Sequence, residues 1–470
     1  MSEKLTAKQA AEQLLYKPEY AADKSTGVKK EAAAFAEGYK AFLNAAKTER
    51  EAAAVSEKML LEAGYEKFEP KKTYAPGQKI YFVQEHKAVV AATIGQRSFE
   101  EGFRLVIAHI DSPRLDLRPN PLYEADHFSY FKTHYYGGIR KYQWGTMPLA
   151  IHGVFTRADG SSVSVCVGED ESDPVFCITD LLPHLGAEQG ERKLSDGIRA
   201  EELNILIGSD AVDDEEVKEA VKLNTMILLN EKYGMTEEDL ISAEIEVVPA
   251  GPARDMGLDR SMILGYGHDD RVCAYPSMLA QINVANVERT SITLIVDKEE
   301  IGSVGATGMT SRFFENTVAE IMTLAGKDSP LALRRALAHS RMLSSDVSAG
   351  FDPGYAGKFE TKNAAFMGRG LCFNKYTGSR GKGGSNDADA EYVALIRDIM
   401  DEAGVDFQTC ELGRVNAGGG GTIAYIMAKY GMNVIDSGVA VLSMHALWEV
   451  ANKADIYEAY RGYKAFLERA

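Results

Sequence analysis

The sequence predicts an α/β fold in which a mixed, largely parallel sheet is sandwiched by helices and interrupted by an inserted β-rich domain. Strands alternate with helices in the first and last parts of the chain, which is typical of a sheet covered on both faces. The apolar runs at residues 87–95, 103–110 and 292–296 lack polar alternation, as expected of buried strands. Between residues 115 and 252, short alternating stretches are separated by Gly, Asp and Pro. We therefore expect a second, smaller core in that segment.

The N-terminal part is expected to be helical. Residues 30–64 are rich in Ala, Glu, Lys and Leu, which favour a helix. Phe35, Tyr39, Phe42 and Leu43 recur there at helical spacing. We expect these four side chains to pack in the core rather than to contact a cofactor.

The insertion divides the chain into a discontinuous domain, formed by residues 1–115 and 254–470, and an inserted domain, formed by residues 116–253. The remaining predicted elements are strands at residues 150–155, 162–167 and 406–410, an acidic helical patch at 210–229, a helix at 386–403 and a helix that begins near residue 422.

The charge of the chain excludes some classes of function. Its 470 residues include 52 Lys and Arg and 69 Asp and Glu, a formal net charge of −17. Such an acidic balance repels a phosphate backbone, and no basic run offsets it, so we expect no nucleic-acid partner. No apolar run approaches the ~20 residues of a membrane helix, so we expect no membrane partner.

The cysteines and the N-terminal residues indicate the cellular compartment of the protein. The five cysteines are scattered and form no C-x-x-C pair, which fits neither a disulfide framework nor a thiolate zinc site. The N-terminus leads into a mixed polar helix instead of an apolar leader. We therefore expect a cytoplasmic protein.

Histidines and acidic residues follow several of the predicted strands. In open α/β sheets, ligands bind beyond the carboxyl ends of the strands. His109 lies at the end of the strand at residues 103–110 and Asp111 directly follows it, and their spacing lets the carboxylate orient the imidazole. Taken alone, this pair favours a buried histidine satisfied by its neighbour.

Two pairs of adjacent acids occur in the C-terminal part. Asp269 and Asp270 stand at a predicted helix start, where they could simply cap the helix. Glu299 and Glu300 directly follow the strand at residues 292–296 and precede a glycine. Two adjacent carboxylates at the end of a strand repel each other, so we expect a cation nearby that compensates their charge.

The set as a whole predicts a metal site. Asp346 alone is typical of a turn, and His445 alone is typical of a structural histidine near a strand end. Together with the preceding residues, however, they form a set of nitrogen and oxygen donors that suits one or two zinc-like ions. The chain has no H-E-x-x-H helix, which favours two ions clamping one water over a single-zinc site. The tandem glutamates supply a base beside a ligand.

These motifs, in this order, resemble the aspartyl aminopeptidase and aminopeptidase I family of dinuclear zinc metallopeptidases. The matching motifs are AHIDSP at residues 108–113, the acidic pair at 269–270, DKEEIGS at 297–303, Ser345-Asp346 and Ser443-Met444-His445. The resemblance covers essentially the whole chain, including the insertion. It implies a zinc exopeptidase-like fold, in which the discontinuous domain is catalytic and the insertion is a dimerisation or lid domain.

The resemblance also implies a role for each matching residue. The implied metal ligands are His109, Asp269, Glu300, Asp346 and His445. Asp269 would bridge the two ions, and the sequence leaves open Asp270 in its place. Glu299 would be the general base, which takes a proton from water and passes it to the leaving amine. Asp111 would orient His109.

Four further positions match with other roles. His152 resembles a histidine that reaches from the insertion of one subunit into the active site of its neighbour, where it steadies the oxyanion; a half-buried strand histidine is the alternative. Lys375 resembles a lysine that contacts substrate, and a solvated loop lysine is the alternative. Gly419 and Gly420 lie in a run that lacks the Lys of a phosphate loop, and the resemblance places them beside the bound peptide.

The resulting hypothesis is an aminopeptidase that removes the N-terminal residue from peptides with two divalent ions per chain, Zn²⁺ first, with Co²⁺ or Mn²⁺ as alternatives. Lys375 and a cationic loop through Arg380 and Lys382 favour Asp or Glu at the substrate N-terminus, and a preference for Leu or other apolar residues stays open. The resemblance implies a homo-oligomer, with the dimer as building block of a tetrahedral dodecamer. Two other classes stay open: another two-metal amidohydrolase, such as a carboxypeptidase or deacylase, and a non-catalytic assembly protein.

Overall fold

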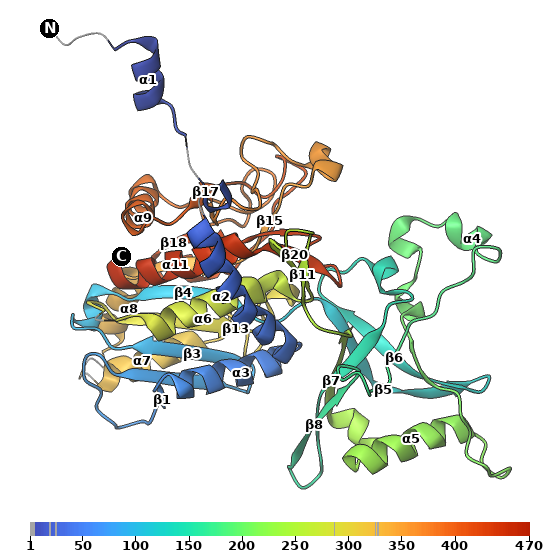
Figure 1. Cartoon of the computed structure of the whole chain (residues 1–470). Helices are drawn as coiled ribbons and strands as arrows, with labels where there is room; N and C mark the ends of the chain where they lie inside the picture. Colours follow the sequence, from blue (N-terminus) through green and yellow to red (C-terminus); the bar gives the residue numbers. More distant parts are fainter. Residues whose placement is uncertain (1–4, 18–19, 24–25, 286, 325, 327–328) are drawn as a thin grey trace.

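A computed structural model describes residues 5–17, 20–23, 26–285, 287–324, 326 and 329–470. Residues 1–4, on which the expected absence of a leader partly rests, lie outside the described residues. The chain forms one large sheet, a second sheet that projects from it, and a small third sheet between them (Figure 1). Its helices are α1 (Ala7–Leu14), α2 (Thr26–Ala45), α3 (Glu49–Glu62), α4 (Ala187–Gly190), α5 (Ala220–Tyr233), α6 (His268–Asn283), α7 (Phe313–Leu324), α8 (Pro330–Ala338), α9 (Ala390–Ala403), α10 (Ala424–Ala428) and α11 (Lys453–Arg469).

The large sheet has nine described strands, and the chain segments that form it lie on both sides of the insertion. In spatial order the strands are β1 (Glu66–Lys67), β2 (Lys79–Gln84), β3 (Ala88–Thr93), β13 (Ser291–Val296), β4 (Arg104–His109), β14 (Arg341–Ser345), β18 (Asn433–Gly438), β16 (Leu371–Asn374) and β17 (Phe407–Thr409). Five of the neighbouring pairs are parallel and three are antiparallel. The prediction of a mixed, largely parallel sheet is confirmed.

Strand β4 shows why the sheet is covered on both faces. Its side chains alternate between two cores. Val106 and Ala108 pack in a core with α2, α3, α6, α9 and α11, whereas Leu105 and Ile107 pack in a core with α7, α8 and α10. The uninterrupted apolar run therefore places apolar side chains on each face of a central strand.

The second sheet is antiparallel and is formed by the inserted segment, except that its strand β5 begins two residues before residue 116. Its strands, in spatial order, are β8 (Ser162–Val167), β7 (Leu149–Thr156), β10 (Ala243–Pro249), β5 (Arg114–Ala125), β6 (Phe128–Tyr136) and β9 (Ile205–Gly208). The sheet has its own core, in which Trp144, Phe155 and Val247 are buried. In Figure 1 it stands beside the large sheet, with α5 along its far side.

A small third sheet joins segments from both sides of the chain. Its strands are β11 (Arg254–Met256), β12 (Met262–Gly265), β20 (Glu449–Asn452), β19 (Ala440–Leu442) and β15 (Ser348–Ala349). Because β12 pairs with β20, the start of α6 lies next to the turn between β19 and β20. This pairing brings Asp269 and His445 together.

The helix predicted over residues 30–64 is two helices, α2 and α3. Thr48 is extended, its hydroxyl accepts a hydrogen bond from the N–H of Glu51, and the Glu51 carboxylate accepts one from the N–H of Thr48. This capping box begins a new helix. Similarly, α9 begins at Ala390 and not at residue 386, because Asp389 caps its first turn.

The predicted packing of the N-terminal aromatic residues is confirmed, and the predicted acidic helix is shorter than expected. Tyr39, Phe42 and Leu43 are buried, and Phe35 packs against the same core. Helix α5 begins only at Ala220, so the acidic stretch at 210–219 is not helical. Among the described residues, no helix combines the length and the apolarity needed to cross a membrane.

Candidate metal centre

The candidate site lies at the carboxyl edge of the large sheet. Strand β4 pairs in parallel with β13 on one side and with β14 on the other, so residues that follow these strands meet at one edge. His109 is the last residue of β4, Glu299 follows β13, and Asp346 follows β14. The His109 side chain is 1% exposed.

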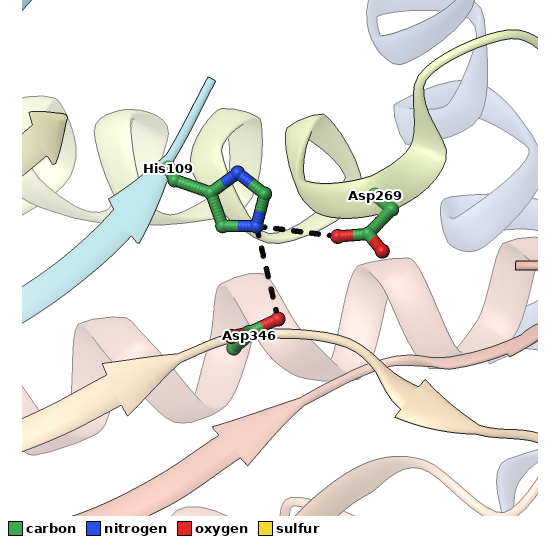
Figure 2. A group of neighbouring side chains, drawn as sticks. All are labelled: His109, Asp269 and Asp346. Carbon is green, nitrogen blue, oxygen red and sulfur yellow. Dashed lines mark ion pairs between the residues drawn. The ribbon is translucent and has the colours of Figure 1, made fainter. Parts of the chain in front are cut away.

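The first group of possible metal ligands surrounds the His109 imidazole. Its Nε2 lies 3.2 Å from Oδ1 of Asp269 and 3.9 Å from Oδ1 of Asp346. Figure 2 shows the three side chains pointing toward one another from β4, from the start of α6 and from the segment after β14. A ligand atom of each residue lies within 4.8 Å of those of the other two.

The second group also contains Asp269. Oδ2 of Asp269 lies 3.1 Å from Nε2 of His445, and this nitrogen lies 3.4 Å from Oε1 of Glu300. The ligand atoms of these three residues again lie within 4.8 Å of one another. One oxygen of Asp269 thus faces His109 and the other faces His445.

The donor set fits zinc. Each group offers an imidazole nitrogen and carboxylate oxygens, which are zinc ligands. Oε1 of Glu300 is buried and has no hydrogen-bond partner among the described residues. Among the described residues that line the adjacent cavity, none is Lys or Arg and His445 is the basic side chain, so the lining carboxylates outnumber the basic groups. A buried carboxylate of this kind requires a cation.

The pKa values of the acidic side chains reflect the same excess of buried carboxylates. Burial raises the pKa of Asp346 well above its ordinary value, and the neighbouring Glu299 and Asp270 raise it further. Burial and the charge of Asp269 likewise raise the pKa of Glu300. Burial also acts to raise the pKa of Asp269, but the hydrogen bonds from its two histidines lower it below its ordinary value. A bound cation would favour the ionised form of every one of these groups.

Asp111 links His109 to the tandem glutamates. Nδ1 of His109 lies 3.3 Å from Oδ1 of Asp111 and donates to the Asp111 carbonyl at 3.0 Å. The Asp111 carboxylate accepts hydrogen bonds from the N–H groups of Glu299 and Glu300, both at 3.1 Å. It therefore holds the turn that carries these two side chains.

Asp270 has a different environment from Asp269. Its Oδ2 accepts a hydrogen bond from the backbone N–H of His109 at 3.3 Å, and it belongs to neither ligand group. The alternative that the sequence left open, Asp270 as the bridging residue, has no geometric support.

Glu449 is a residue of the site that sequence reasoning missed. Its buried carboxylate accepts hydrogen bonds from the N–H of His445 at 2.7 Å and from the N–H of Asp269 at 3.1 Å. Burial and the charge of Asp269 raise its pKa to about 8. Its only sequence signal is its position four residues after His445.

A cavity of about 490 Å³ opens beside the two groups. Its lining includes Glu299 and the apolar side chains of Val347, Leu412 and Met444. From the glycine run, Gly420 and Gly421 line it. Gly419 does not, but it has φ +107°, and a Cβ there would lie 1.8 Å from the carbonyl oxygen of Gly378.

Two residues proposed from the sequence do not join the site. Lys375 is 47% exposed, forms an ion pair with Asp387 and does not line the cavity. His152 is 2% exposed; its Nδ1 lies 2.9 Å from Glu51 and its Nε2 lies 3.1 Å from Glu169. Both ring nitrogens of His152 face carboxylates of its own chain, and its expected reach into the active site of a neighbouring subunit stays a prediction.

Comparison with known proteins decides the class of this site. Residues 42–467 match the family model for the aminopeptidase I zinc metalloproteases, M18. The chain belongs to the M18 peptidase family. Membership confirms the expected class of enzyme, a zinc metalloaminopeptidase that hydrolyses peptide bonds.

M18 relatives match nearly the whole chain. A probable M18 family aminopeptidase 1 from Clostridium acetobutylicum is 55% identical, covering 93% of this chain and 95% of the relative. A crystal structure of an M18 aminopeptidase from Thermotoga maritima has a TM-score of 0.93 at 42% identity, covering 97% of this chain and 100% of that one. A yeast (S. cerevisiae) mApe1 dodecamer shares the fold, with a TM-score of 0.74 at 19% identity, covering 93% and 96% of the two chains.

Proposed function

We propose that this chain removes the N-terminal residue of peptides with two zinc ions, one held by each of the two ligand groups. His109, Asp269 and Asp346 would hold one ion, and Asp269, Glu300 and His445 the other. The observation that carries the proposal is that the two oxygens of Asp269 face different histidines. Bound zinc supplies a Lewis acid for the scissile carbonyl and lowers the pKa of a water molecule.

Glu299 is proposed as the general base. Its carboxylate lines the cavity, belongs to neither ligand group and lies 3.9 Å from Nε2 of His109. Its pKa is raised by burial and by the charges of Asp269 and Asp111, although His109 acts to lower it. A carboxylate in this place can take the proton of the attacking water and pass it to the leaving amine.

The cavity favours an apolar N-terminal side chain over an acidic one. Val347, Leu412, Met444 and Tyr425 supply apolar surface, and no Lys or Arg stands among the described lining residues. A carboxylate on the N-terminal residue of a substrate would therefore find no Lys or Arg to pair with among these residues. The preference for Asp or Glu that Lys375 suggested is therefore not retained, and we propose Leu-like residues instead.

A substrate panel tests both proposals. Leu, Met, Asp and Glu p-nitroanilides are compared with their N-acetylated forms, with zinc present. We expect kcat/KM to be at least about tenfold higher for Leu and Met than for Asp and Glu, and we expect no hydrolysis of the acetylated compounds. Faster hydrolysis of Asp and Glu would contradict the apolar preference. Removal of the acetyl group, or release of C-terminal residues from peptides, would indicate a deacylase or a carboxypeptidase. Full zinc content without any hydrolysis would indicate an assembly protein.

The inserted sheet is proposed as the surface that pairs subunits. Residues 1–115 and 254–470 would form the catalytic domain, with 116–253 inserted. The insertion exposes large apolar side chains, which mark association surfaces when they cluster. These are Val175, Leu181, Leu182, Leu185, Leu194, Leu228 and Ile241. We propose a homo-oligomer, and a dodecamer like that of the yeast protein with the same fold; light scattering of the purified chain measures its mass.

The described cysteines are all free. This supports the proposed location in a reducing compartment, the cytoplasm.

A further inference from the structure

A three-residue segment of the insertion contacts the candidate centre at several points. Tyr136, Gly137 and Gly138, which we call the Tyr-Gly-Gly segment, end strand β6 and lead out of it. At the base of the inserted sheet, Tyr136 pairs with Arg114, the first residue of β5. The segment therefore lies where the inserted sheet meets the large sheet.

Tyr136 acts on the turn that carries the tandem glutamates. Its side chain is buried, and its hydroxyl donates a hydrogen bond to Oδ2 of Asp111 at 2.8 Å. The same carboxylate accepts the N–H groups of Glu299 and Glu300. The phenol thus fixes the orientation of the group that holds the proposed base and a proposed ligand.

Tyr136 is itself held from the side of the insertion. The guanidinium carbon of Arg114 lies 3.9 Å from the centre of the Tyr136 ring, a distance at which a cation attracts an aromatic face. Arg114 is in turn paired with Glu49 of α3 at 3.3 Å and with Glu246 of β10 at 3.0 Å. The ring is therefore clamped between the two sheets.

The two glycines contact both residues that complete the second ligand group. Gly137 has φ +73°, and a Cβ there would lie 3.3 Å from Cβ of Glu300. The carbonyl of Gly138 accepts a hydrogen bond from Nδ1 of His445 at 2.9 Å, and a Cβ on Gly138 would lie 3.2 Å from the same nitrogen. Because a carbonyl only accepts, Nδ1 carries a proton, and the neutral ring has Nε2 free to bind a metal.

We propose that the Tyr-Gly-Gly segment is a positioning element of the catalytic centre, through which the inserted sheet sets the geometry of the proposed base and of the second zinc group. This inference rests on the proposed function. It gives the insertion a role within its own chain, separate from any role in pairing subunits. The residues act through Asp111, Glu300 and His445 and do not themselves contact the substrate.

Two variants test the two halves of the inference. Tyr136→Phe removes the hydroxyl that orients Asp111. We expect kcat for Leu-p-nitroanilide to fall about 10- to 100-fold, the size of loss typical of hydrogen-bond partners around a metal centre, while KM stays within about twofold of wild type. Gly138→Ala keeps the carbonyl but crowds the imidazole; we expect one of the two zinc ions to bind about tenfold more weakly. Zinc affinity is measured on the metal-free protein by competition with a chelating dye.

Matched controls lie in the same part of the chain. Tyr135→Phe changes the neighbouring tyrosine, which is 41% exposed. Gly190→Ala adds a methyl group to an exposed insertion glycine with nothing within 4 Å of the new atom. Both controls should match wild type in kcat and in zinc affinity, and a loss in either control equal to that of its partner would overturn the inference.

The outcomes separate this inference from the proposed function. A wild-type chain that holds one tight zinc ion instead of two contradicts the proposed function. Equal zinc affinity of Gly138→Ala and wild type, in a chain that binds two ions, contradicts the positioning role. An unchanged kcat of Tyr136→Phe contradicts it as well, and if that variant does not fold, the zinc affinity of Gly138→Ala decides.

Discussion

Replacing Asp111 by asparagine perturbs the centre without removing a proposed ligand. The carboxylate accepts three hydrogen bonds: from the Tyr136 hydroxyl and from the N–H groups of Glu299 and Glu300. The two backbone donors bond to different oxygens of the carboxylate. The NH₂ group of an asparagine must therefore face one of these N–H groups, and two donors cannot bond.

The expected loss follows from these contacts. A hydrogen bond to a charged group contributes about 1.5–3 kcal/mol, and Asp111→Asn loses at least one of this kind. If the loss falls on the placement of Glu299 in the transition state, kcat decreases about 10- to 100-fold, or about 1.4–2.7 kcal/mol. Asp111 belongs to neither ligand group, so the zinc content should stay at two ions per chain.

Steady-state hydrolysis of Leu-p-nitroanilide and elemental analysis of the same samples test this reasoning. The control is Asp259→Asn, a change at an exposed loop aspartate that accepts hydrogen bonds from Ser261. A kcat of Asp111→Asn within about twofold of wild type, with two zinc ions bound, would refute the proposed role.

Three further predictions concern the base, a charged cluster and the metal. Glu299→Gln should keep both zinc ions while kcat falls about 10²- to 10⁴-fold; near-normal turnover would show that the base lies elsewhere. His152→Ala should lower the melting temperature. Burial acts to lower the pKa of His152, but hydrogen bonds to Cys166, Glu169 and Glu51 raise it to about 11. The pairing of protonated His152 with these carboxylates therefore stabilises the fold fully below the ordinary pKa of 6.5, and this stabilisation is lost as the pH rises toward 11. The difference in melting temperature between the variant and the wild type should narrow between about pH 6.5 and pH 9. A difference that widens over this range would contradict the pairing. Dialysis against a chelator should abolish hydrolysis, and added zinc should restore it; activity that survives complete removal of metal would exclude a metal-dependent mechanism.

The sequence identified His109, Glu300 and His445 because they end or follow apolar strands, and Asp269 because it begins a helix. The parallel pairing of β4 with β13 brings His109 and Glu300 together, and the apolar composition of these two strands is recognisable in the sequence. Asp346 was expected after a helical segment, but it follows β14, whose sequence Arg-Met-Leu-Ser-Ser has no continuous apolar run. The large sheet and its helical layers could be predicted for the same reason.

Other features depend on contacts that no local pattern reveals. Glu449 holds Asp269, 180 residues earlier, and the Gly138 carbonyl holds His445, 307 residues later. Neither residue has a sequence signal for the partner it finds in the fold. Lys375 pairs with the loop carboxylate of Asp387 in this chain, and its expected contact with the substrate stays a prediction.

A local sequence pattern marks the break between α2 and α3, but the helix-forming composition of the segment led to the prediction of one continuous helix. Thr48 and Glu51 have the spacing of a capping box, within a segment rich in helix-forming residues. Helix propensity alone predicted continuity there, and the cap determined where the second helix begins.

Whether Asp269 is shared by two zinc ions can be measured as the zinc content of a set of variants, by elemental analysis of protein freed of loosely bound metal. We expect two ions in the wild type, one each in Asp346→Ala and His445→Ala, and close to none in Asp269→Ala, because Asp269 belongs to both groups. Two ions retained by Asp269→Ala, or fewer than one in the wild type, would contradict a centre built around this shared carboxylate.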